Sequence, residues 1–139
     1  MGKIITKLTV INHKEELYAE DGKLEPEKVH QIVLDDVLVD TGATTLCLPS
    51  KYIKQLDLKK YKTVAVSTVY GTSEKRIYQD VSIKLIERTT VCECIEISDD
   101  SQPLLGVIPL EMLGIELDLQ SQKLKFLPYD LLSTYITVF

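Results

Sequence analysis

The sequence predicts an all-β protein with one domain, and three observations support this prediction. Short segments rich in β-branched and apolar residues recur along the chain, turn-forming residues separate them at short intervals, and a length of 139 residues suits one domain with its own core. Repeated short strands with such turns are typical of a β-barrel or a β-sandwich. We expect one of these two architectures, with one or two short helices.

The first half of the chain predicts two strands and one helix. Residues 3–11 are rich in β-branched residues and predict the first strand. Residues 12–28 are polar, contain a glycine and a proline, and predict a loop or a wide hairpin. Residues 29–39 predict a second strand, which is strongly apolar at its end. A short helix then begins after a proline, and Ser50 is its candidate N-cap.

A hairpin with a glycine at its tip is expected in the middle of the chain. Residues 63–70 and 75–86 predict its two strands, and residues 71–74, which read Gly-Thr-Ser-Glu, predict the connection. Residues 89–97 predict a further strand, and the polar residues 98–103 predict a loop.

The C-terminal part predicts a short helix and a second hairpin. Pro109 stands where a first helical turn tolerates proline, and Gly114 stands where the helix ends. Residues 115–119 and 123–127 predict two strands joined by a tight turn. Residues 133–139 are also strand-like, but the sequence assigns them no neighbour.

The charge of the chain argues against nucleic acid as a partner. Its net charge of −5 comes from 21 acidic and 16 basic residues, and phosphate binding requires clustered lysine and arginine. The one basic cluster, residues 59–62, is explained by a solvated turn. The first residues lack the apolar stretch of a secretory signal, and no segment is apolar enough to span a membrane. We expect a cytoplasmic protein without a membrane partner.

The three cysteines predict neither a disulfide framework nor a metal site. Cys47, Cys92 and Cys94 are odd in number, and two of them stand only two residues apart. They offer too few ligands for a structural zinc. We expect reduced, half-buried thiols, with metal or redox roles as the less favoured interpretations.

One segment carries a candidate catalytic group. In residues 37–43 an apolar strand leads to Asp40, and Thr41, Gly42 and Ala43 can form a tight turn after it. An aspartate after a strand is often only a turn residue. A second segment, Leu104-Leu105-Gly106, is common by itself, but here it follows a glycine-tipped hairpin and a strand, and a capped helix comes after it.

These motifs and their order resemble the retropepsin-like (retroviral-type) aspartic peptidases, and in particular their single-domain bacterial and archaeal members. The resemblance covers about residues 29–127 and implies one protease domain over residues 1–139, with the closed β-barrel of these enzymes. It implies that Asp40 is the catalytic acid, that Thr41, Gly42 and Ala43 complete the active-site loop, and that the hairpin is a flap over the substrate. Further residues implied are Tyr70, Gly71 and Thr72 in the flap, and Leu104, Leu105 and Gly106 beside the acid.

The sequence departs from the retroviral pattern at two positions. Retroviral enzymes usually carry an aspartate after the alanine and an arginine after the second glycine, and these two residues pair. Here the positions hold Thr44 and Val107. Because both partners are replaced together, no buried charge is left alone.

The chain contains only one Asp-Thr-Gly, so the chemistry requires a second copy. The resemblance implies a homodimer in which the two Asp40 carboxyl groups share one proton and activate a water against a peptide bond, without metal or cofactor. We expect at least one chain terminus at the dimer interface and a peptide or protein as substrate. Two alternatives remain open: a protease-like dimer that binds peptides or scaffolds a complex without cutting, and a small β-barrel interaction domain in which Asp40 only forms a turn.

Overall fold

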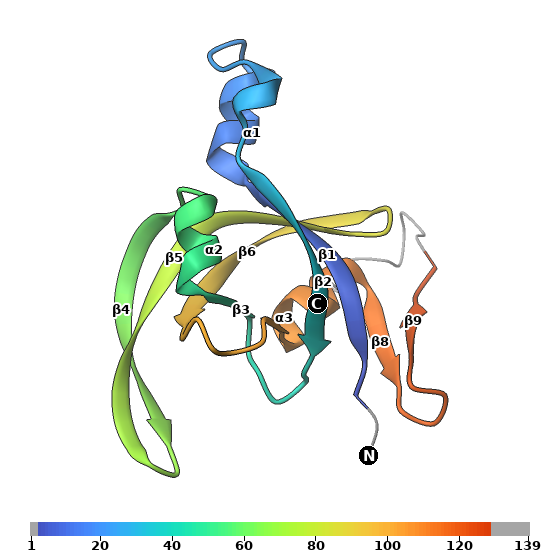
Figure 1. The fold of residues 1–139 in the computed structure, drawn as a ribbon. Helices are drawn as coiled ribbons and strands as arrows, with labels where there is room; N and C mark the ends of the chain where they lie inside the picture. Colours follow the sequence, from blue (N-terminus) through green and yellow to red (C-terminus); the bar gives the residue numbers. More distant parts are fainter. Residues whose placement is uncertain (1–2, 129–139) are drawn as a thin grey trace, which may run out of the picture.

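A seven-stranded sheet forms most of the computed structural model, which describes residues 3–128 (Figure 1). The strands pair in the order β1-β2-β7-β3-β6-β5-β4. Their bounds are β1 Ile5–Asn12, β2 Gln31–Val39, β3 Leu46–Pro49, β4 Lys59–Thr68, β5 Gly71–Leu85, β6 Arg88–Ile97 and β7 Leu104–Leu105. A second, two-stranded sheet joins β8 (Ile115–Asp118) to β9 (Lys123–Phe126). The predicted β class is confirmed.

Strand β1 closes the sheet on one side because it pairs with two neighbours. It runs antiparallel to β2 and also antiparallel to β5, where Val10 lies opposite Ile83. Two pairings in the sheet are parallel, β2 with β7 and β3 with β6, whereas β7 and β3 between them pair antiparallel. The sheet therefore curves back on itself where β1 pairs with β5. This curvature is the part of the closed-barrel expectation that the structure supports.

The core lies between the curved sheet and two helices, α2 (Ser50–Gln55) and α3 (Val107–Leu113). Alternate residues of β1 point inward, as expected for a half-buried strand. Buried aliphatic side chains from all layers meet there, and the largest include Leu8, Leu46, Leu48, Leu56, Ile83, Leu85, Leu105 and Leu113.

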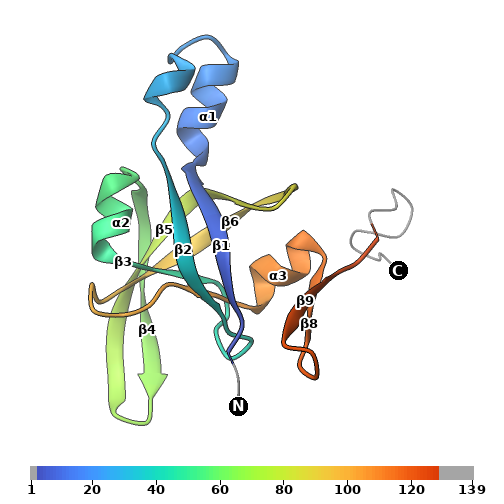
Figure 2. The same ribbon diagram turned by 45° about the vertical axis from the view of Figure 1, so that its right-hand side comes forward.

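The prediction of a loop or wide hairpin over residues 12–28 is wrong in part: the segment joins the antiparallel strands β1 and β2, but it contains helix α1 (His13–Glu20) and a 3-10 turn (Pro26–Lys28). The Asn12 side chain caps α1 by accepting a hydrogen bond from the backbone N–H of Glu15, at 3.1 Å. The helix buries no residue and projects from the sheet (Figure 2). Its lack of an apolar stripe explains why the periodicity of the sequence did not indicate it.

The predicted role of Ser50 as an N-cap is also wrong. Pro49 occupies the cap position of α2 and makes no side-chain hydrogen bond there. Ser50 instead donates its hydroxyl to the carbonyl of Ile97, at 3.4 Å. The carboxylate of Asp99 accepts a hydrogen bond from the backbone N–H of Lys51, at 2.8 Å. A loop distant in sequence therefore supplies the acceptor for an N–H group in the first turn of this helix.

The central hairpin is longer and tighter than expected. Strand β4 begins at Lys59, so the basic residues 59–62 lie in a strand and not in a turn. Thr68 pairs with Gly71, which places Val69 and Tyr70 at the tip. Residues 72–74 pair with β4 and do not form the connection that we predicted. Gly71 adopts a φ of +116°, which permits the reversal directly after Tyr70.

The C-terminal prediction is confirmed for the described residues. Helix α3 carries Pro109 in its first turn and ends at Gly114, which has a left-handed φ of +69°. Strands β8 and β9 form the second predicted hairpin. The strand-like residues 133–139 lie outside the described part of the chain. Among residues 3–128, no helix is long and apolar enough to cross a membrane.

Candidate active site

The carboxylate of Asp40 stands at the point where strand β2 leaves the core. Val37 and Val39 bury their side chains and fix the end of the strand, and Asp40 itself is half-buried. The backbone N–H of Asp40 donates to the carbonyl of Leu105, at 3.0 Å, and thereby extends the parallel β2–β7 ladder by one bond. The sheet thus presents this acid at the start of the β2–β3 loop.

The loop after Asp40, residues 40–45, is held tightly by its own backbone, and we call it the acid loop. The N–H of Gly42 donates to Asp40 Oδ1 at 2.9 Å, and the N–H of Ala43 donates to the Asp40 carbonyl at 3.1 Å. A Cβ at Gly42 would lie 3.1 Å from that same Oδ1, so glycine allows the backbone to approach the carboxylate closely. Thr41 is exposed.

No cation neutralises the acid in the single chain. Among the described residues, neither a basic side chain nor any side-chain donor pairs with Asp40, so the Gly42 N–H is its one donor. A carboxylate that is half-exposed and has one backbone donor keeps lone pairs free for water or for a second acid.

The second motif packs directly against the acid loop. The N–H groups of Val107 and Ile108, in the first turn of α3, donate to the carbonyls of Ala43 and Thr44, each at 2.9 Å. These donors have no partner within the helix, so the acid loop satisfies them. These two hydrogen bonds join the acid loop to α3 at Thr44 and Val107, the two positions where the sequence departs from the retroviral pattern.

Gly106 allows the two segments to come this close. A Cβ on this residue would lie 2.5 Å from the carbonyl oxygen of Thr45 and 2.6 Å from that of Ala43. Both are backbone atoms, which cannot swing aside as a side chain can. The structure therefore brings Leu104, Leu105 and Gly106 beside the acid loop, although they lie far away in sequence.

The predicted flap residues lie apart from the acid in this conformation. Tyr70 is 97% exposed at the hairpin tip, and Gly71 and Thr72 are exposed beside it. The tip and the acid loop lie at the same end of the molecule in both views, opposite α1 (Figures 1 and 2). The hairpin therefore lies on the same side of the molecule as the acid loop, and the Tyr70 side chain at its tip is not packed against the rest of the chain.

A thiol and a lysine that the sequence did not single out lie near the acid. Cys47 on β3 pairs with Leu104 of β7. Burial raises the pKa of the Cys47 thiol to about 11, the charge of Asp40 adds to this rise, and the charge of Lys75 on β5 opposes it. Cys47 is therefore within the electrostatic reach of both groups. Only the register of the sheet brings the three together.

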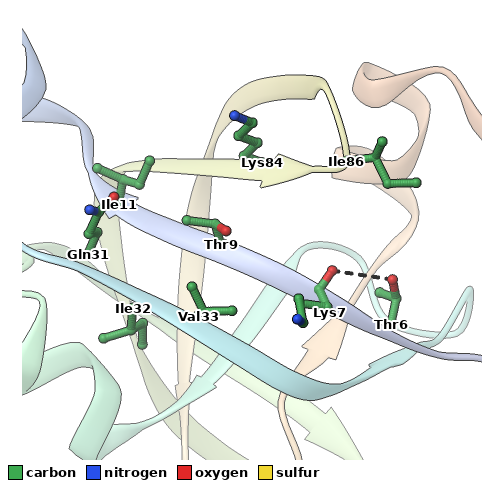
Figure 3. Close-up of a pocket in the computed structure, with 9 residues that line it drawn as sticks. All are labelled: Thr6, Lys7, Thr9, Ile11, Gln31, Ile32, Val33, Lys84 and Ile86. Carbon is green, nitrogen blue, oxygen red and sulfur yellow. Dashed lines mark hydrogen bonds between the residues drawn. The ribbon is translucent and has the colours of Figure 1, made fainter.

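One wide hollow on the surface is distinct from this site. It lies on the outer side of β1, with Thr9 at its centre and Val33 and Lys84 on the two neighbouring strands (Figure 3). None of its nine lining residues carries a carboxylate. Within residues 3–128, no group of three or more His, Cys, Asp or Glu side chains could hold a metal ion.

Comparison with known proteins supports the fold. No family model and no curated protein matches the sequence. Among solved structures, that of the EIAV protease in complex with an inhibitor is similar, with a TM-score of 0.56 and 24% sequence identity. The match covers 85% of this chain and 94% of that one. The chain therefore has a fold similar to that of a retropepsin, and its site residues rest on the geometry above.

Proposed function

We propose that this chain is an aspartic endopeptidase that acts as a homodimer, with Asp40 from each subunit forming the catalytic pair. In this proposal residues 1–139 are one protease domain, and the substrate is a peptide or a protein. The observation that carries the proposal is the acid loop: a half-exposed carboxylate without a cation, held at a strand end by backbone bonds to the second motif.

The chemistry follows from two such acids facing each other. Two carboxyl groups within hydrogen-bond distance cannot both ionise cheaply, so they share one proton. The ionised member takes a proton from a water held between them, and the protonated member donates to the scissile carbonyl oxygen. No acyl-enzyme forms, so Cys47 has no catalytic part, and neither metal nor cofactor is required.

The remaining residues of the acid loop have positioning roles in this proposal. The hydroxyl of Thr41 is exposed, and no described residue of the same chain accepts from it or donates to it. In the dimer it is placed to bond with the opposite loop and to fix the distance between the two acids. Gly42 leaves room for the water and the substrate next to the carboxylate.

The β4–β5 hairpin is the proposed cover of the substrate. An extended peptide that binds as an added strand satisfies its backbone groups against the hairpin and excludes water from the bond to be cut. Tyr70, Gly71 and Thr72 at and beside the tip would close over the peptide. The exposed apolar tip, where Val69 is 93% and Tyr70 97% accessible, has little to cover it in the single chain.

The decisive experiment combines peptide cleavage with the oligomeric state. Purified protein is incubated with a decapeptide library over a wide pH range, and the Asp40→Asn variant is compared with Asp36→Asn. Asp36 is an exposed aspartate on the same strand and makes the matched control. We expect a dimer by sedimentation and cleavage that Asp40→Asn abolishes while Asp36→Asn retains it. Cleavage that survives Asp40→Asn, or a monomer that cleaves peptides, would overturn the proposal.

Two other outcomes correspond to the alternative functions. A dimer that cuts no peptide at any pH would be a protease-like binder. A monomer without activity would be an interaction domain in which Asp40 forms only a turn.

A further inference from the structure

The charge of this protein is distributed unevenly in space. Within residues 59–77, Lys59, Lys60, Lys62, Lys75 and Arg76 stand against the single acid Glu74, which gives this part of the hairpin a net charge of +4 and leaves −9 for the rest of the chain. The hairpin that reaches past the acid loop is therefore a strongly basic element on an acidic protein.

The register of the hairpin gathers cations that lie far apart in sequence. Strand β4 carries the first three lysines, and the pairing places Thr63 opposite Arg76 and Val64 opposite Lys75. Neighbouring strands lie about 5 Å apart, so the cations of the two strands lie close together, although successive residues point to opposite faces of the hairpin. Arg76 is partly neutralised by Glu96, at 3.5 Å. The three lysines of β4 are exposed.

Lys75 differs from the other cations because it alone among the five is half-buried. Residues two apart on a strand share a face, so Lys75 points to the same side as Ile77, which is only 7% exposed. Ile77 pairs with Ile95 of β6, and Ile95 pairs with Cys47 of β3, so these side chains share the face on which Lys75 lies. The charges of Lys75 and Asp40 both act on the Cys47 thiol. Within residues 3–128, no carboxylate lies within ion-pair distance of Lys75.

We propose that the β4–β5 hairpin selects acidic peptides and that Lys75 is a specificity-determining residue, which binds a glutamate or aspartate side chain close to the bond that is cut. This inference rests on the proposed function, because it takes the hairpin as the cover of the peptide cleft. A half-buried cation without an anion is incompletely compensated, and a carboxylate of the ligand supplies its partner.

The exposed lysines of β4 have a second effect in this proposal. They raise the local concentration of acidic peptides and speed association, and salt screens this attraction over about 8–10 Å. A peptide fits this arrangement better than a nucleic acid does, because the net charge of −9 outside the hairpin repels a long run of phosphates. A short peptide with one or two acids meets the hairpin alone.

Binding to the Asp40→Asn variant tests the inference without cleavage. The probes are two fluorescein-labelled decapeptides of one sequence, with glutamate in one and glutamine in the other at two positions on each side of a central Leu-Phe pair. Lys75→Gln is compared with Lys84→Gln, which removes the same charge from an exposed position further along β5, in the hollow of Figure 3.

We expect the glutamate peptide to bind about fivefold more tightly than the glutamine peptide, which is the size of a favourable partly exposed ion pair. Lys75→Gln should remove this preference, Lys84→Gln should leave it, and Lys75→Glu should favour a lysine-substituted probe. Equal binding of the two probes, binding of neither, or an equal loss in both glutamine variants would overturn the inference.

Cleavage by the unmodified chain separates this inference from the proposed function. Acidic preference in binding without any cleavage would contradict the endopeptidase and retain the acidic selectivity. Cleavage of library peptides without enrichment of aspartate or glutamate near the cut bond would retain the endopeptidase and contradict the selectivity.

Discussion

Replacing Gly106 by alanine tests the contact between the second motif and the acid loop. The added Cβ would meet the Thr45 carbonyl oxygen at 2.5 Å and the Thr45 nitrogen and Ala43 oxygen at 2.6 Å, whereas unstrained contacts lie about 1 Å further out. All three neighbours are backbone atoms, so α3 and the acid loop must separate.

The size of the effect follows from two contributions. Forcing a methyl group into a closely packed site costs about 1–3 kcal/mol. Separation also weakens the hydrogen bonds from Val107 and Ile108 to the acid loop, and each is worth about 1 kcal/mol. Gly106 has a φ of −92°, so alanine adds no conformational strain. The free energy of unfolding should fall by about 4 kcal/mol, or roughly 10–15 °C in Tm for a domain of this size.

The matched control is Gly22→Ala, in which the added Cβ meets no other atom but the backbone conformation disfavours alanine. Gly22 has a left-handed φ of +74°, but no heavy atom lies within 4 Å of a Cβ built there. Its replacement should cost only the conformational strain, about 1 kcal/mol. Urea unfolding at one fixed protein concentration measures both variants, since dimerisation makes stability depend on concentration. If Gly106→Ala is no less stable than Gly22→Ala, the packing argument for the second motif is wrong.

Three further predictions concern residues outside the acid loop. Arg88 donates to the carbonyls of Leu113, Gly114 and Leu127, so Arg88→Met should lower the free energy of unfolding in urea by about 2–3 kcal/mol; an unchanged midpoint would contradict this. Asn12→Ala removes the cap of α1 and two hydrogen bonds to the turn between α2 and β4. We expect the free energy of unfolding to fall by about 2 kcal/mol and the backbone amides of α1 to exchange faster. Unaltered amide exchange would argue against the cap. Burial raises the pKa of Cys47 from 9.0 to about 11, so above pH 9 the unfolded chain releases a proton that the folded chain keeps. The free energy of unfolding should therefore fall as pH rises from about 9 to 11. Cys47→Ala should make this fall less steep, and an equally steep fall in both proteins would refute the prediction.

The sequence predicted those elements whose signals are local. The β-branched strands, the C-terminal hairpin and α3 between its proline and Gly114 depend on neighbouring residues alone, and the structure confirms them. Helix α1 also had a local signal, because Asn12 is followed three residues later by Glu15, a pattern typical of a helix start. Our interpretation rested on the polar composition of residues 12–28 and on their glycine and proline, whereas a helix that buries nothing can be polar throughout.

Long-range pairing determined what the sequence could not predict. The cap of α2 comes from Asp99, in a loop that follows another strand. The position of Lys75 opposite Val64, and near Cys47 and the acid, depends on the register of β4–β5 and on the packing of β3 against β7. A shift of one residue would turn Lys75 to the other face, and no pattern along the chain fixes that register to one residue.

The absence of an ion pair to Asp40 among residues 3–128 is consistent with the chemistry proposed for the acid loop. Four hydrogen bonds between backbone groups hold the loop: Asp40 to Leu105, Ala43 to Asp40, Val107 to Ala43 and Ile108 to Thr44. The Thr45 hydroxyl donates a further one to the carbonyl of Glu93. Only the bond from Gly42 ends on the carboxylate. A general acid–base must gain and lose its proton in each cycle. A loop held by an ion pair to that carboxylate would loosen at each protonation, whereas backbone bonds keep the geometry constant. In the proposed mechanism, the backbone bonds from Val107 and Ile108 to Ala43 and Thr44 therefore hold the loop in the same place in either protonation state of Asp40.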